Sequence, residues 1–204
     1  MSLFGKVTEK SWETHGSGPE FSNDAFPGLP VARTALRVLM AVMFSVFALM
    51  SVAYVERMEL ADWSRVALPN LLWINTAVLV LASIAMQWAR VTVAKPDGKH
   101  FKLAMLAGGV LTLVFLAGQW MAWQEMGSAG YFAYSNPYNA FFYLFTGLHA
   151  VHLLGGLFVW ARAEIRFVTG AGLQAIRLSV ELCSVYWHFL LLVWLVLFGL
   201  LLST

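Results

Sequence analysis

The chain has 204 residues, of which 60% are apolar and only 12% are charged, and its mean hydropathy is +0.71. An ordinary soluble domain carries about 25% charged residues, so this composition excludes a water-soluble globular protein and indicates a membrane protein. The net charge is only +2, with the basic residues dispersed between apolar runs, which argues against a nucleic-acid-binding protein, and the single cysteine, Cys183, excludes a disulfide framework within the chain.

Residues 1–32 are polar, contain acidic residues, and end in a stretch with Pro27 and Pro30. They lack the basic patch followed by an apolar run that marks a cleavable signal peptide. We therefore predict a cytoplasmic N-terminal arm that lies on the membrane surface or on a partner.

Five uninterrupted apolar runs follow, each of about the 20 residues needed to cross roughly 30 Å of hydrocarbon. Only helices satisfy all backbone hydrogen bonds of such runs in lipid. Residues 33–204 are therefore predicted to form an all-α, polytopic bundle of five transmembrane helices. The predicted spans are 34–55, 69–89, 102–123, 138–161 and 182–203.

Lysine and arginine residues alternate in number between the segments that connect the spans. The N-terminal segment and the second and fourth connections hold 11 of them, whereas the first and third connections and the C-terminus hold two. The positive-inside rule then places the N-terminus in the cytoplasm and the C-terminus outside, in the periplasm of a bacterium.

Few polar side chains occur within the spans. Because a charge at the bilayer centre costs several kcal/mol, ionisable groups there are the first candidates for function. The residues that stand out are Gln119 in the third span, His149 and His152 in the fourth, and Glu181 and His188 at the start of the fifth.

His149 and His152 are three residues apart and so share one face of a helix. Gly147, Gly155 and Gly156 lie beside them, where small residues would let a neighbouring helix approach closely. This arrangement predicts tight packing of the fourth span around the two histidines.

His152 and His188 lie at nearly the same depth when 1.5 Å per residue is counted along antiparallel helices, so the two rings could meet. One interpretation makes them haem or metal ligands, as in a self-contained membrane cytochrome with two axial histidines, or proton relays. The other makes the histidines neutral donors that join the last two helices and hold lipid or a partner subunit. We favour the second, because no second histidine pair, cysteine cluster or carboxylate occurs at mid-depth.

Two motifs resemble subunit III of the haem–copper respiratory oxidases. The sequence TGLHAVH at 146–152 resembles the T-G-x-H-x-x-H stretch of that family, and Glu181 followed by YWHF at 186–189 and VWL at 193–195 resembles its E-x4-[YF]-W-H-F-x-D-x-V-W-L ending. Weaker similarity extends upstream, through LP at 68–69, NT at 75–76, Ser83 and Gln119. The five spans resemble the short bacterial form of subunit III.

The resemblance implies an accessory membrane subunit of an oxidoreductase complex for aerobic respiration. Such a subunit carries no haem, copper or catalytic residue of its own, packs with subunits I and II, and binds phospholipid in the bacterial inner membrane. Haem and copper in the partner subunits would pass electrons from cytochrome c or quinol to oxygen and pump protons. The residues expected to contact lipid or a partner, or to serve structure, are His149, His152, Glu181, Trp187, His188 and Gln119.

Three positions depart from the family pattern by lacking an acid. Met40 and Ala41 stand where the family usually has Ser-Glu, Ala122 stands where a Glu is often found, and Leu191 replaces an Asp. These losses argue against a direct role in proton uptake. They also keep open an alternative within the superfamily, an accessory subunit of a nitric oxide reductase.

Overall fold

Five long helices make up most of the computed structural model, which describes residues 31–95, 98–170 and 172–203. The chain divides into a unit of residues 1–35 and a unit of residues 36–204, and the packing described below lies within the second. The predicted arm of residues 1–32 falls outside the described residues except for its last two. The helices are α1 (Val31–Arg57), α2 (Leu71–Thr92), α3 (Gly98–Ser128), α4 (Pro137–Val168) and α5 (Leu173–Ser203).

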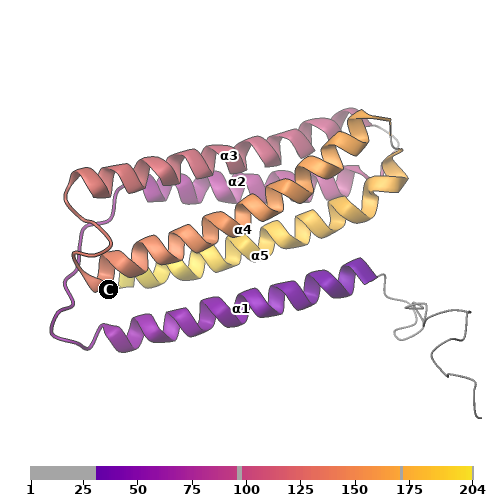
Figure 1. Cartoon of the computed structure of the whole chain (residues 1–204). Coiled ribbons are helices and arrows are strands. Elements are labelled where there is room, and N and C mark those ends of the chain that lie inside the picture. Colours follow the sequence, from indigo (N-terminus) through magenta and orange to yellow (C-terminus); the bar gives the residue numbers. More distant parts are fainter. Residues whose placement is uncertain (1–30, 96–97, 171, 204) are drawn as a thin grey trace, which may run out of the picture. The chain divides into compact units, whose positions relative to one another are not determined.

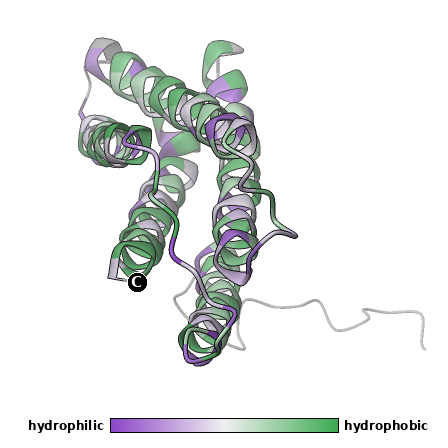
Figure 2. Ribbon diagram, turned by 90° about the vertical axis from the view of Figure 1, so that its left-hand side faces the viewer, coloured by the Kyte–Doolittle hydropathy of each residue, from purple (hydrophilic) through white to green (hydrophobic). Residues whose placement is uncertain are grey.

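All five helices are long and apolar enough to cross a membrane. Their 22 to 32 residues correspond to about 33–48 Å at 1.5 Å per residue. In Figure 2 the hydrophobic colouring dominates along the helices. The prediction of an all-α fold with five membrane-spanning helices is therefore confirmed, and the chain is a multi-pass membrane protein.

Several helices extend beyond the apolar runs that predicted them. Helix α5 begins at Leu173 rather than at 182, and α4 continues to Val168 rather than ending at 161. The hydrocarbon boundary limits which side chains are tolerated, but it does not interrupt backbone hydrogen bonding. The added segment of α5, LQAIRLSVE, consists largely of good helix formers, so the helix starts well before the apolar run.

Local chemistry sets both ends of α4. Asn136 caps its start, with its side chain accepting a hydrogen bond from the Tyr138 backbone N–H at 3.0 Å, and Pro137 occupies the first turn, where no N–H is needed. The Asn136 side chain also donates to the backbone carbonyl and hydroxyl of Ser64, in the α1–α2 connection. After the helix, Gly170 adopts φ +96°, a left-handed conformation that terminates α4.

Helices α2 to α5 form a closed ring of four neighbours (Figure 1). Helix α2 packs on α3 and α5, and α4 packs on α5 and α3, with successive helices antiparallel. Helix α1 lies outside this ring and has only three buried side chains, Met43, Phe47 and Tyr54. The bundle of five helices is therefore a four-helix bundle with one peripheral helix.

Only one of the three glycines predicted to allow close helix packing does so. A Cβ atom at Gly156 would lie 2.8 Å from the Tyr186 ring, so this glycine does admit α5. Gly147 and Gly155 have nothing within 4 Å of such a Cβ, and the expectation that they serve packing is wrong. The tightest contacts are at two α3 glycines: a Cβ at Gly118 would lie 2.1 Å from the Asn75 side-chain oxygen on α2, and one at Gly109 would lie 2.2 Å from the Trp160 indole on α4.

We expect the Gly109→Ala variant to unfold more readily than the wild type, because its methyl group would come within 2.2 Å of the rigid Trp160 ring. Overpacking of this kind costs about 1–3 kcal/mol. Gly147→Ala is the matched control in an open position, where alanine should stabilise the helix by up to about 1 kcal/mol. Denaturation by SDS titration in detergent micelles measures both, and equal shifts for the two variants would contradict the packing described.

Candidate functional site

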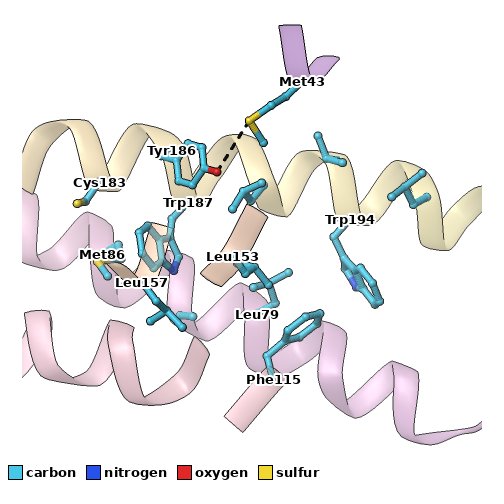
Figure 3. Close-up of a cluster of buried hydrophobic side chains, with 14 of the residues drawn as sticks. Met43, Leu79, Met86, Phe115, Leu153, Leu157, Cys183, Tyr186, Trp187 and Trp194 are labelled. Carbon is cyan, nitrogen blue, oxygen red and sulfur yellow. Dashed lines mark hydrogen bonds between the residues drawn. The ribbon is translucent and has the colours of Figure 1, made fainter. Parts of the chain in front are cut away.

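Two tryptophans of the C-terminal motif join α5 to the helices that face it. The Trp187 indole N–H donates to the Thr112 hydroxyl on α3 at 2.8 Å, and that of Trp194 donates to the Thr76 hydroxyl on α2 at 3.0 Å. Both rings are almost fully buried, and Figure 3 shows them projecting from α5 into the bundle core. Since the two residues are seven apart, they lie on one face of the helix and hold it at two levels.

His149 forms the central polar contact between α4 and α5. Its ring is fully buried, its Nε2 atom donates to the Leu190 backbone carbonyl at 3.1 Å, and it packs on the rings of Trp194 and Phe115. Because a carbonyl only accepts, the bonded Nε2 carries a proton, and Nδ1 has no hydrogen-bond partner among the described residues. The ring thus links α4 to α5 through its Nε2 atom alone.

Gln119 is buried on the same face of α3 as Phe115, one turn further along the helix. Neither polar atom of its side chain has a hydrogen-bond partner in the described part of the chain. Its neighbour on the other side, Trp123, donates its indole N–H to the Thr146 hydroxyl on α4 at 2.9 Å. Along α3, Gln119 thus lies between Phe115, which packs on His149, and Trp123, which bonds to Thr146.

His152 lies where α1, α4 and α5 meet. Its Nδ1 atom hydrogen-bonds to the Leu148 carbonyl at 2.7 Å, and its ring packs on Phe47 of α1. From α5, the Tyr186 hydroxyl donates to the His152 backbone carbonyl at 3.0 Å and lies 3.8 Å from the Met43 sulfur (Figure 3). This contact is one of the few that hold α1 to the ring of four helices.

A pocket of about 350 Å³ opens beside this junction and is termed here the α1–α4–α5 pocket. Four lining residues carry polar side-chain atoms, namely His152, Cys183, Tyr186 and Trp187, and the other walls are apolar. The Tyr186 hydroxyl and the Trp187 N–H are already hydrogen-bonded within the bundle. Its lining comprises Leu36, Leu39, Val151, His152, Gly155, Gly156, Val159, Leu182, Cys183, Tyr186 and Trp187.

His188 lies in a different place, on the outer surface between α2 and α5. Its exposed ring hydrogen-bonds through Nδ1 to the Ser184 carbonyl at 2.6 Å. It lines a second pocket of about 450 Å³, the α2–α5 pocket, together with α2 residues such as Ser83 and Gln87. His152 and His188 thus line separate pockets, and the predicted meeting of the two rings is wrong, because they emerge on different faces of the α4–α5 pair.

Glu181 lies near the start of α5 and pairs with Arg177 one turn before it, with 3.2 Å between Nε and Oε1. An exposed pair of this spacing on one helix contributes about 0.3–0.5 kcal/mol. The two side chains partly neutralise each other at the helix start.

Several residues that join the helices were missed by reasoning from sequence. Threonine hydroxyls such as those of Thr76 and Thr112 accept the tryptophan N–H groups, and Trp160 donates to the Met105 carbonyl at 2.9 Å. A threonine within an apolar span was the sequence signal that could have indicated such a contact. The residue that it bonds to depends on how the helices pack. Among the described residues, no group of three or more His, Cys, Asp or Glu side chains converges as a metal site requires.

Residues 34–202 match the protein family described as cytochrome c oxidase subunit III. The chain is 30% identical over 128 residues to the probable cytochrome c oxidase subunit 3 of Nocardia farcinica, an alignment that covers 61% of each protein. It is also 30% identical over 125 residues to cytochrome c oxidase subunit 3 of Triticum aestivum, covering 61% of this chain and 46% of that relative. With the subunit of the same name from Thermostichus vulcanus the identity is 27% over 129 residues, and 63% of each chain is covered. The aligned part thus spans less than two thirds of the length of each of these relatives.

We expect the Trp187–Thr112 hydrogen bond to appear as a coupling energy in a double-mutant cycle of Trp187→Phe and Thr112→Val. Hydrogen bonds between membrane helices average about 0.6 kcal/mol and reach about 1.7 kcal/mol by this method. The free energy of unfolding in detergent of the wild type, both single variants and the double variant provides the cycle. Additive losses would show that the bond does not stabilise the bundle.

Proposed function

We propose that this chain, which belongs to the cytochrome c oxidase subunit III family, serves as a non-catalytic subunit of a haem–copper terminal oxidase in a bacterial inner membrane. In this proposal haem and copper reside in the partner subunits I and II, which pass electrons from cytochrome c or quinol to oxygen. This chain stabilises subunit I and retains phospholipid.

The observation that carries the proposal is that the side chains of the two family motifs form hydrogen bonds between helices. His149 uses Nε2 on the Leu190 carbonyl, and Trp187 and Trp194 use their N–H groups on threonines of neighbouring helices. Groups engaged in this way join helices. This supports a structural role for the motifs by which the family is recognised.

Basic residues support the proposed orientation. Arg90, Arg166 and Arg177 lie at the ends of α2 and α4 and near the start of α5, which is the end of the bundle opposite to the one where α1 ends (Figure 1). The positive-inside rule assigns that end to the cytoplasm, and the C-terminus then lies in the periplasm.

The α1–α4–α5 pocket supports the proposed retention of lipid. It lies between membrane-spanning helices, and its lining is almost entirely apolar, so an acyl chain would fill it at no cost in hydrogen bonds. Gly155 forms part of the wall without contacting another helix. The pocket thus suits a bound phospholipid, held by one tail.

Two alternatives receive no support from the geometry. A cytochrome with two axial histidines would need His152 and His188 on opposite sides of one haem, and they line different pockets. The absent acids that suggested a nitric oxide reductase subunit are a sequence feature to which the structure adds nothing, and the relatives described above are named as oxidase subunits.

Replacing Gly155 by Phe should fill the α1–α4–α5 pocket and release lipid without unfolding the bundle, because nothing lies within 4 Å of a Cβ at that position. We expect the purified complex to lose one phospholipid per chain, as counted by native mass spectrometry. Gly147→Phe is the matched control, on the same helix in an equally open position that does not line the pocket. Equal lipid content in the two variants would contradict lipid binding at this site.

Purification of the tagged chain from native membranes tests the assignment itself. We expect a large subunit with haem and copper to co-purify in a one-to-one ratio, and the complex to consume oxygen with reduced cytochrome c or quinol. Stoichiometric haem in this chain alone, or a complex that reduces nitric oxide and not oxygen, would overturn the proposal.

A further inference from the structure

The α2–α5 pocket lies on the outer surface of the bundle and carries exposed polar side chains from two helices. Gln87 and His188 are both exposed there, one from each helix, within a lining that is otherwise largely apolar. They are linked through Ser184, whose hydroxyl donates to Gln87 Oε1 at 3.1 Å and whose carbonyl accepts from His188 Nδ1. The two helices thus present a joined pair of polar side chains.

These bonds determine what the pocket offers to an occupant. Because His188 donates through Nδ1, its Nε2 atom is left as an acceptor in the neutral ring. Gln87 uses its oxygen on Ser184, which leaves its NH₂ group as a donor. Ser83 also lines the pocket, but its hydroxyl oxygen is buried. An occupant with both a donor and an acceptor would satisfy Gln87 and His188.

The depth of the pocket makes this requirement strict. Ser83 and Gln87 lie nine and five residues before Thr92 at the end of α2, or about 13 and 8 Å along the helix axis. Acyl chains offer no hydrogen bonds, and polar groups that face them are costly. Acyl chains therefore cannot satisfy the pocket.

A lipid head group is also a poor match, because none of the eight lining residues is charged. The walls instead provide apolar side chains around the polar centre, among them Ile84, which is 59% exposed, and Trp88, which is 42% exposed. A polar centre with an apolar surround is the surface that one transmembrane helix presents to another.

We propose that the α2–α5 pocket docks a transmembrane helix of the large catalytic subunit, which inserts a hydroxyl, amide or protonated carboxyl side chain between Gln87 and His188. The inference rests on the proposed function and names the face that the partner covers. Lipid would then occupy the α1–α4–α5 pocket and protein the α2–α5 pocket.

Photo-crosslinking in the intact complex tests which partner covers the pocket. Benzoylphenylalanine at Ile84, on the pocket wall, should crosslink to the large subunit. The same probe at Leu49 should label lipid. Leu49 is 71% exposed and lies on α1, which does not line the α2–α5 pocket. Crosslinks from Ile84 to lipid only or to a second copy of this chain, or crosslinks to the large subunit from Leu49 and not from Ile84, would overturn the inference while leaving the proposed function intact.

Substitution of the polar pair measures its contribution to docking. Gln87→Leu and His188→Leu should each raise the fraction of this chain released from the complex by detergent about threefold, which corresponds to about 0.6 kcal/mol for one hydrogen bond between membrane helices. Ser45→Ala is the matched control, an exposed hydroxyl on α1 bonded to its own helix at Ala41. Release equal to that of the control would count against the pocket, and failure of any large subunit to co-purify with the wild type would overturn both this inference and the proposed function.

Discussion

The absence of water in a membrane interior is the constraint on which the rest of this structure depends. A buried N–H group there has to find its acceptor within the protein. Four tryptophans, Trp123, Trp160, Trp187 and Trp194, do so on a neighbouring helix, three on threonine hydroxyls and one on a backbone carbonyl. Because each donor and its acceptor come from different helices, satisfying the indoles also positions the helices.

The same constraint explains why α1 differs from the other helices. Among the described residues, no buried indole joins it to the ring of four, and it is held by the packing of Met43, Phe47 and Tyr54 and by the Tyr186 hydroxyl near the Met43 sulfur. Apolar packing of this kind is less directional than a hydrogen bond. A loosely attached helix leaves room beside it, and the α1–α4–α5 pocket lies there.

Two of the positions that lack the acids of the family pattern have a defined place in the structure. Ala122 is fully buried in the core, where a carboxyl group would need a hydrogen-bond partner. Leu191 lines the α2–α5 pocket, so the pocket is uncharged where the resemblance leads one to expect an Asp. A partner helix would then meet hydrogen-bonding groups rather than a fixed charge.

Composition and run length alone determined the class of the protein, the five spans and their order, because a stretch of apolar residues has only one stable structure in lipid. The two C-terminal motifs likewise identified the family. Tertiary structure alone decided which neighbours each glycine and histidine meets. Gly156 admits α5, while Gly147 and Gly155 do not contact it. His152 and His188 line separate pockets although they lie at similar depth. The reason is that the sequence specifies how far along a helix each residue lies and which other residues of that helix share its face. The rotation of each helix about its axis depends on the contacts that its buried side chains make with other helices.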